Sequence, residues 1–240
     1  MSYYPILTAP YCSGKTTLYN FSPNDWESVD KCDQVVSLTY IKDGLWHSKT
    51  IEELKYQSYK VVNHSDIVDL IPDGALALLS LSKGELPDTS KELPILSCNH
   101  TNVPNYRATL GLESASTEAS YQGEIDPFPP QASMLTFSPF LQFGEDIENY
   151  VLLMNLEKSP ENKEVEVEVY DAHSKELMKV QSAFSNQINI ISLDDVGFDE
   201  QSLPIVVCRG MASIPLYFSS YKRGKILSLE HTHPPASLVV

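Results

Sequence analysis

The sequence predicts an all-β protein of two tandem β-sandwich domains, jelly-roll-like in their strand spacing and related by internal duplication. Three observations support this prediction. Apolar and charged residues alternate with a period of two, short apolar runs are separated by turn-forming clusters, and a series of segments from the first half reappears in the same order in the second half. Many short strands with this spacing are typical of sandwiches and barrels.

The clearest predicted strand is EVEVEVY at residues 164–170, in which Val165, Val167 and Val169 alternate with glutamates. Successive side chains of a strand point to opposite faces, so the valines are expected to face a core and the glutamates to face solvent. The segments SLTY and INIIS are similar, and the clusters KDG, DAHS and PDG predict turns between strands.

An internal repeat organises the chain. The stretch around Val36 can be laid without gaps over the stretch around Val165, and this places Asp66 on Asp195. The same match puts the pair VV at residues 61–62 on the pair II at residues 190–191. Four further matches keep the same order: LYNF with LMNL, which sets Asn20 on Asn155, ELPILSC with SLPIVVC, LGLE with LSLE, and ILTAPY with MLTFSPF. A repeated unit of this kind indicates duplication.

The matches set the predicted domain boundaries. The first copy covers residues 1–120, a linker rich in proline and turn formers covers 121–129, and the second copy covers 130–240. The first copy carries an insertion with one extra apolar run at residues 75–81.

The composition excludes several partners. With 32 acidic and 17 basic residues the formal net charge is −15, which repels a phosphate backbone, so no nucleic-acid partner is expected. No apolar run reaches the roughly 18 residues of a membrane-spanning helix, so no membrane insertion is expected. The first residues lack the basic region and long apolar core of a secretory signal. The cysteines lack C-x-x-C and zinc spacing, which predicts reduced thiols in a cytoplasmic protein: Cys12, Cys32, Cys98 and Cys208.

The stretch TAPYCSGKTTL at residues 8–18 fits the loose form of a phosphate-binding loop through Gly14, Lys15 and Thr16. Such a loop needs a helix directly after it, whose N-terminus binds the phosphates. Pro23 lies where the interior of that helix would be, and the second copy has no Gly-Lys-Thr. We therefore expect no nucleotide site and place the motif in the turn before a strand.

The segment LEHTHPP at residues 229–235 is the strongest candidate metal site. In an extended strand His231 and His233 point to the same side, a spacing that metal sites use, and His100 or His173 would supply a third ligand. A metal-binding protein or metal-dependent enzyme is thus one hypothesis. The competing interpretation is a C-terminal tail with surface histidines.

Two weaker patterns remain. Cys98 and His100 share one strand face, the arrangement that a thiol nucleophile and its base require, although buried cysteines explain the pattern without catalysis. Tyrosines offer stacking surfaces for a sugar, which makes a carbohydrate-binding module a further hypothesis, although aromatic residues more often serve cores. The candidates are Tyr3, Tyr4, Tyr11, Tyr56 and Tyr59.

The second copy resembles the soluble transducer protein of microbial sensory rhodopsins. The resemblance is carried by an apolar strand ending in Asn155 and by the segments VEVEVYD, LDDV and LPIVVCR, with a fainter version in the first copy: Asn20, VSLTYIKD, HSDI and LPILSCNHT. It implies a cytoplasmic, non-catalytic sandwich that forms oligomers and relays a signal or binds a partner. The family forms single-domain tetramers, so a dimer of this duplicated chain would present four sandwiches. The family's Arg-rich strand segment is missing here, so no contact residue is carried over.

The leading hypothesis is therefore a non-catalytic binding or adaptor protein that can form a homo-oligomer. No cofactor and no catalytic residue are assigned. Its ligand, whether a protein, a small molecule or a glycan, stays open. The alternatives are the metal site at His231, His233 and His100 and the carbohydrate-binding module. Fold alone does not choose among them.

Overall fold

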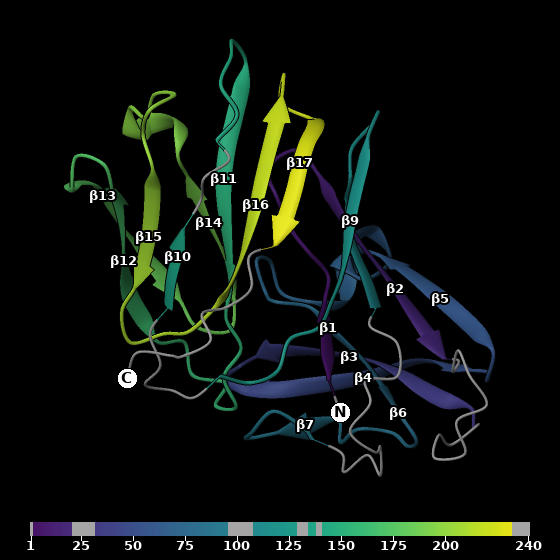
Figure 1. The fold of residues 1–240 in the computed structure, drawn as a ribbon. Coiled ribbons are helices and arrows are strands. Elements are labelled where there is room, and N and C mark those ends of the chain that lie inside the picture. The colour runs from purple at the N-terminus through teal and green to yellow at the C-terminus, as the bar shows by residue number, and fades with distance from the viewer. Residues whose placement is uncertain (1, 21–31, 96–107, 129–133, 138–140, 232–240) are drawn as a thin grey trace, which may run out of the picture. The chain divides into compact units, whose positions relative to one another are not determined.

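The computed structural model of the chain describes residues 2–20, 32–95, 108–128, 134–137 and 141–231. Within these residues regular structure consists of strands β1–β17 and the short 3-10 helices η1–η3, so the predicted all-β class is confirmed (Figure 1). The strands form four antiparallel sheets. Among the same residues there is no helix with the length and apolar character needed to cross a bilayer.

The chain divides into two compact units, each with two of the sheets. Unit 1 contains Met1–Leu7, Ser13–Leu112 and Ser120–Asp126, and unit 2 contains Thr8–Cys12, Glu113–Ala119 and Pro127–Val240. Residues 121–126, which were expected to begin a linker, lie in unit 1. Residues 121–123 complete β9, and Ile125 is fully buried and exchanges backbone hydrogen bonds with Tyr3 at 3.2 and 2.8 Å.

Unit 1 has a five-stranded sheet in the order β1-β6-β3-β4-β7 and a four-stranded sheet in the order β5-β2-β8-β9. The bounds of its elements are β1 Tyr3–Pro5, β2 Ser13–Asn20, β3 Gln34–Lys42, β4 Leu45–Leu54, β5 Ser58–Asn63, η1 His64–Asp66, η2 Val68–Leu70, β6 Leu78–Ser82, β7 Thr89–Ser90, β8 Ala108–Glu113 and β9 Glu118–Gly123.

Unit 2 has two four-stranded sheets, in the orders β10-β15-β12-β13 and β14-β11-β16-β17. The bounds of its elements are β10 Met134–Phe137, β11 Ile147–Met154, β12 Glu164–Asp171, β13 Glu176–Phe184, β14 Ile188–Ser192, η3 Asp194–Val196, β15 Pro204–Cys208, β16 Ile214–Tyr221 and β17 Lys225–His231.

The two units use the same strand order. If β1 to β6 are matched with β10 to β15, and β8 and β9 with β16 and β17, each sheet of one unit has a counterpart with identical neighbours, apart from the extra edge strand β7. The pairing register agrees in the second sheets. Thr17 faces Val61 on β2 and β5, and Leu152 faces Ile190 on β11 and β14. These are the positions that the sequence match had placed together.

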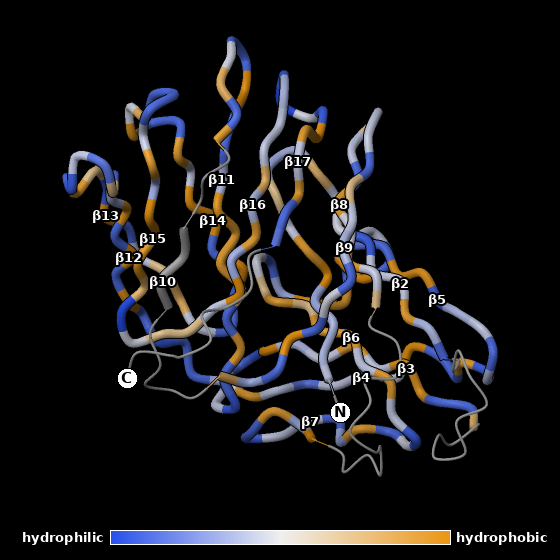
Figure 2. Tube along the Cα trace, viewed as in Figure 1, coloured by the Kyte–Doolittle hydropathy of each residue, from blue (hydrophilic) through white to orange (hydrophobic). Residues whose placement is uncertain are grey.

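The buried faces follow the predicted alternation. On β12, Val167 and Val169 are fully buried and Val165 is half-buried, whereas Glu164 and Glu166 are exposed. One core cluster of unit 2 takes residues from β11, β12, β13, β14, β15 and β16, so both of its sheets bury a face in the same core. Figure 2 shows the same separation, with β14 and β15 largely hydrophobic and the turns of unit 2 mostly hydrophilic.

The gapless match is wrong by two residues at the first strand of the central hairpin. The buried apolar residues of β3 are Val36 and Leu38, which correspond to Val167 and Val169 and not to Val165 and Val167. The cause is turn length. Lys42 pairs directly with Leu45 across a two-residue turn, whereas residues 171 and 176 pair across four residues.

Two further matches of the sequence repeat do not coincide with equivalent strands. The run at residues 75–81, interpreted as an insertion, supplies β6, the neighbour of β1 and β3, which is the place that β15 holds in unit 2. ELPILSC does not hold that place, since residues 92–95 form no strand and 96–98 lie outside the described residues. LGLE lies on β8 but LSLE lies on β17, which is the counterpart of β9.

Candidate functional site

The structure describes two of the four candidate metal ligands. His231 is the last residue of β17 and is exposed, and His173 is exposed in the turn between β12 and β13. His233 and His100 lie outside the described residues. Within the described part of the chain, no group of three or more His, Cys, Asp or Glu residues is placed to hold a metal ion. The metal hypothesis therefore gains no support from the residues that can be placed.

The Gly-Lys-Thr motif lies inside β2, and not in the turn before it as expected. Lys15 and Thr16 pair with Asn63 and Val62 of β5, and the Thr16 hydroxyl donates a hydrogen bond of 2.9 Å to the Pro5 carbonyl. A Cβ atom at Gly14 would lie 2.0 Å from the Leu7 carbonyl oxygen. The glycine is thus required for close backbone packing, which explains the motif without a phosphate.

Most of the cysteines and tyrosines that were candidates for catalysis or sugar stacking are buried or half-buried where they are described. Cys208 is fully buried, burial raises the pKa of its thiol to about 11, and Cys12 and Cys32 are free half-buried thiols. Cys98 lies outside the described residues. Of the tyrosines proposed for sugar stacking, Tyr3 and Tyr4 are buried, Tyr56 is half-buried, and Tyr11 and Tyr59 are exposed. Trp46 is fully buried near the start of β4.

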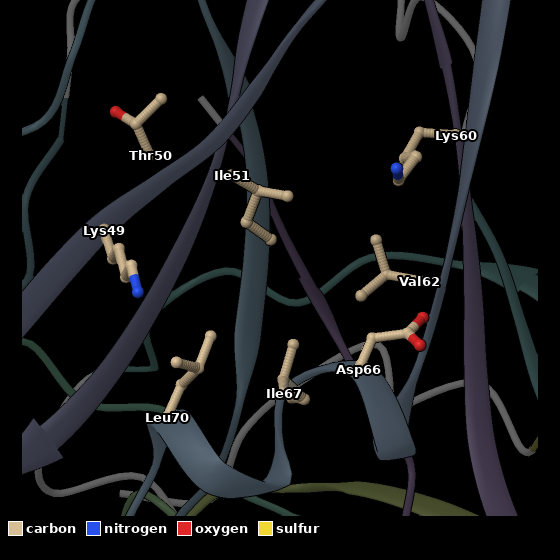
Figure 3. Close-up of a pocket in the computed structure, with 8 residues that line it drawn as sticks. All are labelled: Lys49, Thr50, Ile51, Lys60, Val62, Asp66, Ile67 and Leu70. Carbon is tan, nitrogen blue, oxygen red and sulfur yellow. The ribbon is translucent and has the colours of Figure 1, made fainter.

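A cleft of about 260 Å³ in unit 1 is the best-formed candidate binding site. It lies between β4, the edge strand β5 and the η1–η2 segment (Figure 3). On β4, Thr50 faces Ser37 and Glu52 faces Val36, so Ile51 is an extra residue of a β-bulge. Bulges redirect side chains and are frequent beside binding sites. In Figure 3 the Ile51 side chain points into the middle of the cleft.

The wall of the cleft is apolar and its rim is charged. Ile51, Val62, Ile67 and Leu70 form the wall, and Leu70 is the most exposed of them at 36%. The polar groups at the rim are Lys49, Thr50, Lys60 and Asp66. A ligand held here would therefore combine an apolar body with at least one charged group.

Two of the charged groups already have partners. The Lys60 ammonium forms an ion pair of 2.8 Å with Glu52, and Asp66 Oδ2 accepts hydrogen bonds of 2.8 and 3.1 Å from the backbone and side chain of Asn63. No ion-pair or hydrogen-bond partner among the described residues is recorded for the Lys49 ammonium. Lys49 is exposed and lines the cleft, so its charge is available to a ligand.

The corresponding place in unit 2 is closed by an ion pair. Lys49 faces the buried Leu38 across the β3–β4 pair, and Lys179 faces the buried Val169 across the β12–β13 pair. Lys179 Nζ reaches Asp195 at 2.9 and 3.0 Å and donates to the Ser192 carbonyl at 3.1 Å. Asp195 is the residue that the sequence match aligns with Asp66. Lys179 and Asp195 therefore form an ion pair in unit 2, whereas the matching residues of unit 1, Lys49 and Asp66, do not.

Sequence reasoning missed the cleft because its residues are unremarkable one by one. Lysines flanking Ile51 and Val62 look like the polar side of two edge strands. A comparison of the two copies gives no signal either, because SLDDVGF of the second and HSDIVDL of the first each contain three large apolar residues. The segment HSDIVDL becomes η1–η2 and supplies Ile67 and Leu70 to the wall.

Comparisons with known proteins give no lead. No protein-family model, curated protein or solved structure matches the chain.

Proposed function

We propose that the protein is a non-catalytic binding or adaptor protein built from two β-sandwich units that arose by duplication. The matching strand orders and the shared register of β2–β5 and β11–β14 support the duplication. The core cluster that draws on both sheets of unit 2 supports the sandwich arrangement. The fold alone does not identify the ligand, so the ligand has to be inferred from the chemistry of the cleft.

The ligand that fits the cleft is a small amphipathic anion, with its acidic head at Lys49 and its apolar chain on Ile51, Val62, Ile67 and Leu70. The Lys49 ammonium, which has no partner within the part of the chain that the structure describes, carries this proposal, because it is a positive charge beside an apolar wall in a protein of net charge −15. Asp66 lies on the side of the cleft opposite Lys49 and repels a second acidic group (Figure 3). A volume of about 260 Å³ restricts the ligand to a short chain.

Isothermal titration of the full chain with hexanoate, 1-hexanol and hexylammonium tests the proposal. Hexanoate is expected to bind more tightly than the other two, since only it pairs with Lys49. Lys49→Gln should weaken hexanoate binding about five-fold, the effect of one partly exposed charge pair of about 1 kcal/mol. Lys42→Gln removes an equivalent exposed charge from the end of β3, outside the cleft, and should leave binding unchanged.

A second pair of variants tests the apolar wall. Leu70→Ser should weaken hexanoate binding several-fold, whereas Val68→Ser, on the same 3-10 helix and 41% exposed but outside the cleft, should not. Equal binding of hexanoate and 1-hexanol, or equal effects of Lys49→Gln and Lys42→Gln, would contradict the proposal.

A further inference from the structure

Unit 2 contains a second pocket, of about 160 Å³, with a different chemistry. It lies where β11 begins, beside η3, and no lysine or arginine lines it. Its lining includes Gln142, Phe143, Asn149, Asp194 and Phe198. One carboxylate and two phenyl rings thus share a space of roughly five water molecules, taking about 30 Å³ for each.

The pocket is held open by Asn149, which is only 7% exposed. Its Oδ1 accepts a hydrogen bond of 3.0 Å from the backbone N–H of Gln142, and its Nδ2 donates one of 2.9 Å to the Gln142 carbonyl. Its own backbone N–H donates to Asp194 Oδ1 at 2.8 Å, with Nδ2 of the same residue at 3.5 Å. The amide therefore fixes both the loop that carries Phe143 and the carboxylate of Asp194.

The carboxylate of Asp194 lacks a cation. Both recorded hydrogen bonds go to Oδ1, and among the described residues neither an ion pair nor a bond to Oδ2 is recorded. The neighbouring carboxylates have cationic neighbours, Glu148 with Arg223 at 3.8 Å and Asp195 with Lys179 at 2.9 Å. Asp194 is exposed as a residue, but partial desolvation of its carboxylate, together with the charges of Glu148 and Asp195, raises its pKa, whereas the hydrogen bonds from Asn149 lower it. A positive charge at this position would relieve that unfavourable field.

We infer that this pocket binds a small organic ammonium ion, with the carboxylate of Asp194 as counter-ion and the rings of Phe143 and Phe198 in contact with its alkyl groups. An ammonium ion is attracted both to a carboxylate and to the negative face of an aromatic ring. Phe143 is 42% exposed and Phe198 is half-buried, so ring surface is open to a ligand. The net charge of −15 favours the approach of a cation.

The probe is tetramethylammonium, which has five heavy atoms, with tert-butanol as a neutral molecule of equal heavy-atom number. Nuclear magnetic resonance titration of the isotope-labelled full chain, at constant ionic strength with sodium chloride replaced by the probe, reports which amides shift. Saturable shifts at the amides of Asn149, Asp194 and Phe198 are expected with tetramethylammonium. No comparable shifts are expected with tert-butanol.

Asp194→Asn removes the charge but keeps an oxygen that can accept from the Asn149 N–H, so it should weaken tetramethylammonium binding at least about five-fold. Asp146→Asn is the matched control, because Asp146 lies outside the pocket and asparagine tolerates its φ of 65°. It should change binding less than two-fold. Phe198→Leu should weaken binding about two- to five-fold through the lost ring.

Equal shifts with tert-butanol, or unchanged binding by Asp194→Asn, would overturn the inference. If Asp194→Asn does not fold, the tert-butanol comparison and Phe198→Leu decide it. The outcome is independent of the cleft in unit 1, because the two pockets lie in different units and the probes carry opposite charge.

Discussion

Units 1 and 2 share a strand order but place their open surfaces at different positions. In unit 1 the cleft beside η1–η2 is open and its charged pair is apart, whereas in unit 2 Lys179 and Asp195 close the matching place. The opposite holds at the start of the neighbouring strand, which is β2 in unit 1 and β11 in unit 2: here unit 1 is closed and unit 2 has a pocket. Gly14 packs directly on Leu7 in unit 1, whereas Asn149 bridges to Gln142 in unit 2 and lines a pocket.

The matched register makes this second comparison a direct one. Lys15 faces Asn63 and Tyr150 faces Ser192, so Gly14 and Asn149, one residue earlier on each strand, hold the same place. At this shared position unit 1 has a close backbone contact at a glycine, and unit 2 has an asparagine that lines a pocket. The comparison shows that a common framework of strands leaves the binding chemistry to a few residues at strand ends.

The largest effect is expected from removing the close contact in unit 1. Gly14→Val places a Cβ atom 2.0 Å from the Leu7 carbonyl oxygen and 2.9 Å from a methyl of Ile6, so β2 and the segment that follows β1 must separate. We expect a loss of at least about 3 kcal/mol in the free energy of unfolding, measured by urea denaturation. Gly84→Ala is the control, since nothing lies within 4 Å of its Cβ position. Equal stability of the two variants would contradict the contact.

An intermediate effect is expected at the asparagines that the two units share. Asn155 is fully buried, donates to the Ala212 carbonyl at 2.7 Å and accepts from the Asn186 N–H at 2.9 Å. Asn20 donates to the Leu54 carbonyl at 2.8 Å. Replacement by alanine leaves these backbone groups unpaired, so each variant should lose about 2 kcal/mol. A loss confined to Asn155→Ala in urea denaturation would show that the two residues are not equivalent.

The smallest effect is expected at the ion pair of unit 2. Lys179→Gln removes the contact with Asp195, whose side chain is 63% exposed, so the loss of stability should stay below about 1 kcal/mol. Thermal unfolding in low and in high salt measures it, and the difference from the wild type should shrink in high salt. A loss of several kcal/mol would mean that Lys179 supports unit 2 through packing rather than charge.

The all-β class, the alternation of β12, the turns at KDG and DAHS and the match of Asn20 with Asn155 could all be predicted from the residues alone. These features depend on local chemistry, since a period of two and turn-forming residues can be read within a few positions. Tertiary structure alone decided that residues 75–81 supply β6 and that LGLE and LSLE lie on unmatched strands. Strand neighbours in a sheet are set by contacts between distant segments, and short apolar runs resemble one another too closely to reveal their partners. The two pockets arise in the same way, because each depends on whether side chains from separate elements meet, as at Lys179 and Asp195, or stay apart, as at Lys49 and Asp66.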